Sequence, residues 1–182
     1  DTITEDADLS YRAQLKGWRG VYLKDLVVPA ELPVEVNAFK SQQHRWAKGN
    51  AQVIRKLMKT ILLSKASLHT KAECWFHLTA NCNYMLMVIL AIIMVPCMVF
   101  RTGTPAKMLL LTDGPFFVLN AVSVGLYFGL SQREVKNNKG WTKRIKYIPC
   151  LMSLGIGLGL NQAKAVLEGF FTNDIEFKRT PK

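Results

Sequence analysis

The chain has 182 residues, of which 49% are hydrophobic, and a formal net charge of +11. Its mean hydropathy of +0.11 is high for a soluble domain and low for a bundle of membrane helices, which argues against both extremes and predicts a polar part followed by lipid-embedded segments. The chain begins at Asp1 without a Met or a signal-peptide pattern and stops at Lys182. We therefore expect it to be part of a longer protein.

The charge is unevenly placed along the sequence. Acidic residues gather in the first eight positions, no Asp or Glu lies between Lys40 and Lys71, and a second basic cluster runs from Arg133 to Lys146. Because both basic clusters flank hydrophobic stretches, they indicate the cytoplasmic face of a membrane. We expect a lipid bilayer as a partner and no nucleic acid.

The cysteines and histidines predict no further site. None of the four Cys forms a C-x-x-C pair, and the three His show no metal-ligand spacing. We infer neither a disulfide framework nor a zinc site.

The first 50 residues alternate helical and extended patterns. Thr4 is a good N-cap, and the acidic residues after it suit the first turn of a helix that would stop at Gly17. Residues 20–28 are rich in Val and Leu and predict one or two short strands. Pro33 suits the start of the next helix.

That next helix carries Gln42, Arg45 and Trp46. Their spacings of i,i+3 and i,i+4 place all three side chains on one helical face. Gly49 and Asn50 are expected to break or bend the helix.

A basic amphipathic helix is predicted over residues 51–72. An apolar stripe of helical period lies between basic positions, and such a helix lies in the plane of a membrane interface. The alternative is a helix packed on a soluble core. The stripe consists of Val53, Ile54, Leu57, Met58, Ile61 and Leu62.

Two membrane spans are predicted within residues 75–131. The first extends from Trp75 to Phe100 and exceeds the length that a bilayer requires. The second would run from Gly114 to Ser131, capped by Asp113, with a short interfacial piece before it.

A third apolar stretch, Tyr147 to Phe171, has a shorter uninterrupted apolar run and basic flanks on both sides. A segment whose two ends face the same side does not cross a membrane. It is therefore predicted to be a cytoplasmic interface helix.

The order of motifs is the most specific signal. Thr4-Glu5-Asp6 is followed by Gln42-Gln43-His44-Arg45-Trp46, then by hydrophobic stretches, and finally by Phe177-Lys178-Arg179-Thr180-Pro181-Lys182. This order resembles the processive membrane glycosyltransferases of family 2, the group that contains cellulose synthase and the cellulose-synthase-like mannan and glucan synthases. The resemblance implies an α/β plus membrane α-helical fold class: the C-terminal part of a GT-A-type transferase domain followed by transmembrane and interface helices.

The resemblance implies a role for each motif residue. Transfer of a sugar requires a base for the acceptor hydroxyl, a positive group for the departing diphosphate and a platform for the acceptor. Asp6 would be the catalytic base, Arg45 would lie near the diphosphate, Trp46 would offer its aromatic face to the sugar, and Glu5 and Gln42 would line the substrate pocket. The alternative is that Glu5 and Asp6 merely favour a helix N-terminus.

The tail is similar to the F-x-V-T-x-K gating loop of cellulose synthase through Phe177, Thr180 and Lys182, with Arg179 in place of the usual Val. The family also uses a divalent metal, Mg or Mn, bound by a D-x-D motif. The D-x-D string formed by Asp6 and Asp8 is interpreted as part of the T-E-D motif, so no metal ligands are expected in this sequence.

The resulting prediction has four parts: residues 1–50 as the C-terminal part of a cytoplasmic transferase domain, 51–72 as the interface helix, 75–131 as two transmembrane helices, and 132–182 as a cytoplasmic basic loop, interface helix and gating-like tail. The intact protein would be an inverting, multi-pass enzyme of a bacterial inner (plasma) membrane. It would extend a β-linked glucan or mannan from a nucleotide sugar donor, with the growing polysaccharide as acceptor, and pass the polymer through its membrane helices. This chain alone would be inactive. The alternative is a non-catalytic membrane module, such as a transporter fragment or a scaffold.

Overall fold

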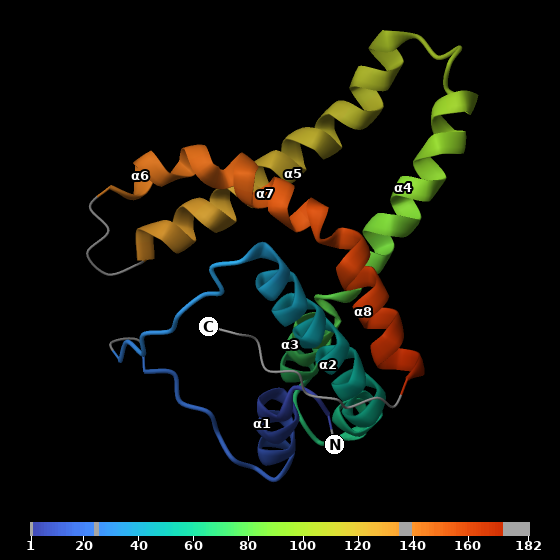
Figure 1. Cartoon of the computed structure of the whole chain (residues 1–182). Coiled ribbons are helices and arrows are strands. Elements are labelled where there is room, and N and C mark those ends of the chain that lie inside the picture. Colours follow the sequence, from blue (N-terminus) through green and yellow to red (C-terminus); the bar gives the residue numbers. More distant parts are fainter. Residues whose placement is uncertain (1, 24–25, 135–139, 173–182) are drawn as a thin grey trace. The chain divides into compact units, whose positions relative to one another are not determined.

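The computed structural model describes residues 2–23, 26–134 and 140–172, and the regular elements of these ranges are helices (Figure 1). The chain divides into two compact units. The first comprises residues 1–90 and 158–182, and the second comprises residues 91–157.

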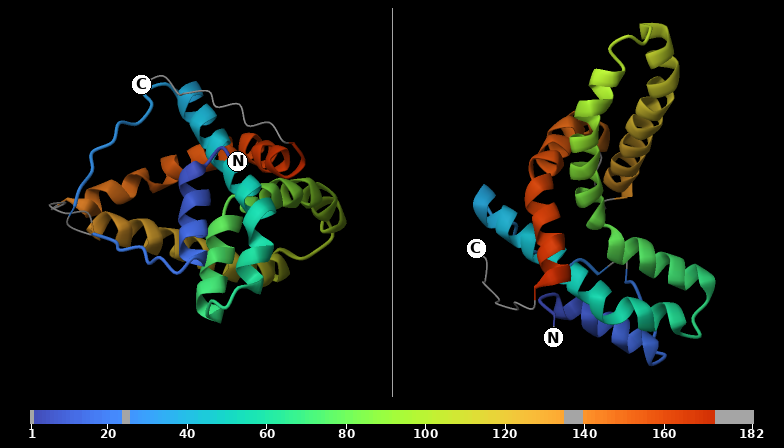
Figure 2. Two further views of the ribbon diagram at one scale, coloured as in Figure 1. Left: turned by 90° about the horizontal axis from the view of Figure 1, so that it is seen from below. Right: turned by 90° about the vertical axis from the view of Figure 1, so that its right-hand side faces the viewer.

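The first unit is organised around one long helix, α2 (Val36–Leu63). The helices α1 (Glu5–Leu15), α3 (Leu68–Thr79) and α8 (Gly159–Phe171) all pack against it. Figure 1 and Figure 2 show α8, the last helix of the chain, running beside α2 in each view. Segments far apart in the sequence therefore meet on a single helix.

Although Leu62 is exposed, most of the apolar stripe of α2 is buried by protein. Together with Tyr11 of α1 and Cys74 and Leu78 of α3, it forms a core that contains Val53, Leu57, Met58 and Ile61. The alternative of a helix packed on a core therefore describes this stripe, and the prediction of a separate interface helix over 51–72 is wrong in its bounds. The helix ends at Leu63, where Ser64 bonds back to the Ile61 carbonyl oxygen, and α3 begins after the N-cap Ser67.

The predicted break at Gly49 and Asn50 does not occur, because α2 continues through both residues. A Cβ atom at Gly49 would overlap the side chain of Thr4. The glycine at this position allows the start of α1 to approach α2 closely. The burial of α2 on several sides outweighs the low helix propensity of Gly49.

A second, smaller core joins α2 to α8. Ala47 and Ala51 meet Ala165 and Val166, and all four are buried. The small side chains allow the two helices to approach closely. At Gly169, a Cβ atom would overlap the Lys48 carbonyl oxygen and lie 2.6 Å from the Ala51 Cβ atom.

The strands predicted over residues 20–28 are absent from the described part of this segment, which has no regular structure. Many of its apolar side chains are exposed, including Val21, Tyr22 and Val27. A strand needs a neighbour to satisfy its backbone groups, and the described residues provide no partner strand. The α/β character of the predicted fold class is therefore not seen, whereas its helical part is.

Among the residues that the structure describes, two helices are long and apolar enough to cross a membrane: α4 (Cys82–Phe100) and α5 (Ala106–Glu134). The first expected span began at Trp75, but that residue belongs to α3, so the apolar helix starts later. The second was expected to begin at Gly114, but α5 runs through both Asp113 and Pro115.

Asp113 therefore lies inside a helix and does not cap one. Its carboxylate pairs with Arg101 at 3.0 Å, just beyond the end of α4. The neighbouring Thr112 hydroxyl donates to the Met108 carbonyl oxygen, as expected for a helical Thr. This polar cluster stabilises the turn between α4 and α5 without interrupting α5.

The segment after residue 139 forms short helices: α6 (Trp141–Arg144), η1 (Ile145–Tyr147) and α7 (Ile148–Gly157). The single helix predicted over 147–171 is divided at Leu158 between α7 and α8, within a run of glycines that weakens helix formation. Counted together, α6 to α8 could form a third candidate span by length and composition.

Candidate functional site

The T-E-D motif forms the start of α1, as predicted. Thr4 is the N-cap residue, and the acidic residues occupy the first turn. Asp6 is exposed, and its Oδ1 atom accepts a hydrogen bond from the Ala7 N–H at 2.8 Å. Its carboxylate therefore satisfies an N–H group that the helix leaves unpaired and still reaches the surface.

Asp8 is directed differently, towards α2. It is buried, and its carboxylate lies 2.6 Å from the Lys56 Nζ atom and 3.1 Å from the Arg12 Nε atom. Burial alone would raise the pKa of Asp8, but the hydrogen bonds and charges of Lys56 and Arg12 outweigh it and hold that pKa below its ordinary value. Asp8 thus joins α1 to α2.

Replacing Asp8 by Asn is expected to destabilise the first unit by about 1.5–3 kcal/mol at neutral pH, because the substitution removes a buried, charge-assisted pair. Since the folded-state pKa of Asp8 is lowered, its contribution is present above its ordinary pKa of 3.8 and is lost as the pH falls through the lower, folded-state value. The difference in thermal midpoint between wild type and Asp8→Asn, followed by circular dichroism in detergent, should therefore shrink in acid. A difference independent of pH would contradict this role.

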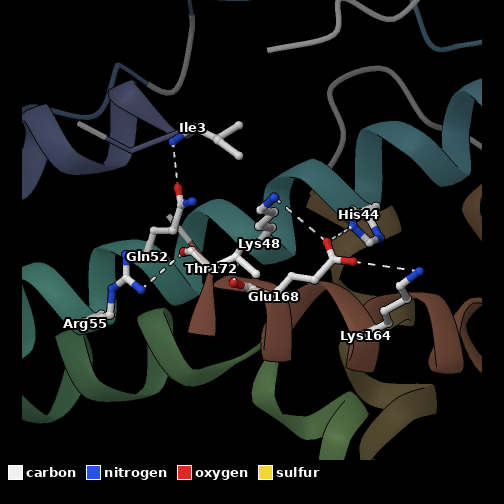
Figure 3. A network of polar contacts seen from close by, with 8 residues as sticks. All are labelled: Ile3, His44, Lys48, Gln52, Arg55, Lys164, Glu168 and Thr172. Carbon is white, nitrogen blue, oxygen red and sulfur yellow. Dashed lines mark hydrogen bonds and ion pairs between the residues drawn. The ribbon is translucent and has the colours of Figure 1, made fainter. Parts of the chain in front are cut away.

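The start of α1 is fixed against α2 by two further contacts. The Ile3 N–H donates to the Gln52 Oε1 atom at 3.0 Å (Figure 3). The Thr4 side chain lies directly over Gly49. The backbone that carries Asp6 is therefore attached to the helix that carries Trp46.

Asp6 and Trp46 line the same open pocket of about 400 Å³. Trp46 is 48% exposed, so much of its ring is available to a ligand. The remaining lining is largely polar and comes from α1, α2, α3 and the turn after α3. It comprises Thr4, Ala7, Ser10, Gln43, Asn50, His77 and Asn81.

The other predicted motif residues do not line this pocket. Glu5 is exposed beside it on α1. Gln42 and Arg45 are half-buried on α2, and the Gln42 Oε1 atom is buried without a hydrogen-bond partner among the described residues. The prediction that Gln42, Arg45 and Trp46 lie on one helix is confirmed, but only Trp46 shares the pocket with Asp6.

Several lining residues were not predicted from the sequence. Gln43, Trp46 and Asn50 recur at helical spacing, so Gln43 and Asn50 could have been found from the position of Trp46. His77 and Asn81 carry no comparable signal, because only the packing of α3 against α1 and α2 brings them to the pocket.

The gating-like residues Phe177, Thr180 and Lys182 lie outside the described residues. The end of α8 and Thr172, the last described residue, are attached to α2 by polar contacts (Figure 3). Glu168 lies 2.9 Å from the His44 Nε2 atom and 3.9 Å from the Lys48 Nζ atom. Arg55 donates to the carbonyl oxygens of Phe170 and Thr172 at 3.0 and 3.2 Å.

The described residues do not fit a divalent metal. No group of three or more His, Cys, Asp or Glu side chains within them is placed to hold one. Asp8, the second acid of the D-x-D string, is already paired with Lys56 and Arg12. We therefore derive no step through a metal in this part of the protein.

Comparison with known proteins shows the family. The model of the glycosyl transferase family group 2 matches residues 1–130, so the chain belongs to that family. This confirms the resemblance drawn from the motifs. No solved structure matches the chain.

The chain is also similar to plant proteins named glucomannan 4-beta-mannosyltransferases. It is 43% identical over 86 residues to a probable glucomannan 4-beta-mannosyltransferase 9 of Oryza sativa subsp. japonica. The matched region covers 47% of this chain and 15% of that protein. It is 48% identical over 64 residues to the glucomannan 4-beta-mannosyltransferase 2 of Arabidopsis thaliana, covering 35% of this chain and 12% of the relative. The chain thus matches only a small part of each relative.

Proposed function

We propose that the intact protein is a membrane glycosyltransferase that adds hexosyl units from a nucleotide sugar to a β-linked polysaccharide of the mannan or glucan type. The observation that carries this proposal is the pocket shared by Asp6 and Trp46, two residues far apart in the sequence. A carboxylate beside an aromatic face provides a base for a hydroxyl group and a platform for a sugar ring.

The names of the relatives favour a mannan-type product with β-1,4 linkages. A non-catalytic membrane module, the alternative left by the sequence, gives no reason for a carboxylate and a Trp to share one polar pocket. Asp6 would act as the base, Trp46 would hold the acceptor, Arg45 would lie near the diphosphate, and Glu5 and Gln42 would bind substrate. The divalent metal that the family resemblance implies would be held by residues outside the described part.

The membrane arrangement is part of the same proposal. The helices α4 and α5 would cross the bilayer and carry the polymer, and the segment 147–171 would remain on the cytoplasmic side. The packing of α8 on α2, within the unit that also contains Asp6, supports this arrangement. The relatives compared are plant proteins, so the bacterial inner membrane proposed from the sequence gains no support from them.

The test uses membranes that contain the intact protein, a panel of nucleotide-activated hexoses and β-1,4-linked oligosaccharides. Wild-type membranes should transfer at least one hexose. Trp46→Ala should raise the KM for the oligosaccharide about tenfold, equivalent to about 1.4 kcal/mol of lost stacking. Arg45→Ala should instead weaken inhibition by the nucleoside diphosphate, because a guanidinium binds phosphate.

His69→Ala is a suitable control for both variants, since His69 is exposed on α3 and its ion-pair partner is Glu73 of the same helix. A folded wild-type protein that transfers no hexose would overturn the proposed function. Unchanged diphosphate inhibition in Arg45→Ala would overturn the role of that residue alone.

A further inference from the structure

His77 occupies an unusual position at the wall of the pocket. It comes from α3 and lines the same pocket as Asp6 and Trp46. Its Nδ1 atom lies 2.5 Å from the hydroxyl oxygen of Tyr11, a residue of α1 that is buried in the core. The imidazole of His77 thus contacts a core residue, Tyr11, through Nδ1, while the His77 side chain as a whole is exposed.

The phenol of Tyr11 keeps its proton and can therefore act as the donor in this hydrogen bond. Burial, and next the neighbouring Cys74, raise the pKa of Tyr11 to about 12, so the hydroxyl keeps its proton at neutral pH. Burial, followed by the charge of Glu73, raises the pKa of the neighbouring Cys74 thiol. Because an imidazole nitrogen is a better acceptor than a thiol sulfur, we assign the phenol as the donor and His77 Nδ1 as the acceptor.

A neutral imidazole that accepts at Nδ1 carries its proton on Nε2. Within residues 2–23, 26–134 and 140–172, the structure gives this Nε2–H group no hydrogen-bond partner. With this assignment, the contact with Tyr11 leaves the Nε2–H group of His77 available at the pocket.

The rest of the lining suits a carbohydrate. A sugar ring has apolar faces of C–H groups and an edge of hydroxyl groups. Trp46 offers an aromatic surface for a face, and Ser10, Gln43, Asn50 and Asn81 offer hydroxyl and amide groups for the edge.

We propose that His77 binds the acceptor sugar, with its Nε2–H group donating a hydrogen bond to a sugar hydroxyl beside Trp46, and that Tyr11 is the positioning residue that fixes the tautomer. This inference rests on the proposed function, since it takes the pocket as the acceptor site. It adds a sugar-binding residue from α3 that no sequence motif contains.

The first experiment measures transfer to β-1,4-mannotetraose by membranes containing the intact protein. His77→Ala should raise the KM for mannotetraose about tenfold, the equivalent of one lost hydrogen bond of about 1.4 kcal/mol. Inhibition by the nucleoside diphosphate should not change. His77→Gln, which retains an N–H donor, should recover most of the affinity. Tyr11→Phe should raise the same KM without changing kcat.

The second experiment does not depend on turnover. Diethyl pyrocarbonate modifies accessible imidazoles, and the modified peptides are identified by mass spectrometry. Mannotetraose should protect His77 in the purified intact protein but should leave the exposed His69 reactive. Protection should be lost in Trp46→Ala.

The outcomes separate this inference from the proposed function. Unchanged KM values in His77→Ala, in membranes that do transfer hexose, would overturn the role of His77 alone. Protection of His77 without transfer in wild type would support the sugar site and contradict the transferase activity. Absence of protection at saturating mannotetraose would overturn the inference whatever the activity.

Discussion

Replacing Asp6 by Asn is expected to reduce hexosyl transfer by the intact protein at least 100-fold, because positioned general bases contribute about 10²–10⁴ to rate. Asn keeps the shape of the side chain and can still accept the Ala7 N–H hydrogen bond seen for the carboxylate, but it cannot accept a proton from the acceptor hydroxyl. Nucleoside diphosphate binding should remain within a few-fold. The measurement is incorporation of radiolabelled hexose into polymer by membranes with equal amounts of wild type and variant.

The competing explanation is that Asp6 serves only the N-terminus of α1, where an acidic residue contributes about 0.3–1 kcal/mol. That explanation predicts a small loss of thermal stability and near-normal polymer synthesis, an outcome that would sink the catalytic assignment. Glu73→Gln provides a matched control, since it removes a carboxylate that is exposed on α3 and does not line the pocket.

Replacing Gly169 by Ala is expected to lower stability by about 1–3 kcal/mol, the usual cost of an extra group in a packed interface. A Cβ atom at this position would overlap the Lys48 carbonyl oxygen. Because backbone cannot rotate away as a side chain can, α8 would have to move from α2. The thermal midpoint in detergent and the rate of hexosyl transfer should both fall.

The same Gly→Ala substitution at Gly155 in α7 is a matched control, for which no loss of stability is expected. A Cβ atom there meets nothing within 4 Å, so Gly155→Ala should be neutral or should stabilise its helix by up to about 1 kcal/mol. If the two variants had equal stability, the close contact between α8 and α2 would not be a determinant of the fold.

Local patterns in the sequence predicted much of the helical structure. The acidic first turn of α1, the helix carrying Gln42, Arg45 and Trp46, and the two apolar helices are all present. The errors lie where tertiary packing overrides local preference. Gly49 was expected to break or bend its helix and Asp113 to cap a new one, but both lie inside continuous helices. Propensity at a single residue is outweighed when the helix around it has long favourable stretches.

In the candidate site, too, local sequence patterns predicted some features and tertiary packing determines the others. Asp6 and Trp46 belong to short motifs and could be predicted, whereas their meeting in one pocket depends on the docking of α1 on α2. The stripe on α2 shows the limit of periodicity: an apolar helical face has the same pattern whether lipid or protein covers it. Here Tyr11, Cys74 and Leu78 cover most of the stripe. The pattern of residues 51–72 gives no sign of these covering side chains, because they lie elsewhere in the sequence.

The contact between Thr4 and Gly49 has a consequence for the energetics of the pocket. Because the Thr4 side chain rests on main chain, a direct contact between the start of α1 and α2 sets the distance between the backbones that carry Asp6 and Trp46. A spacing set in this way is preorganised: the entropy of aligning the two groups is lost once, during folding, and not again for each ligand. The pocket would then select sugars by the thickness and tilt of the ring, with little adaptation to rings of another shape.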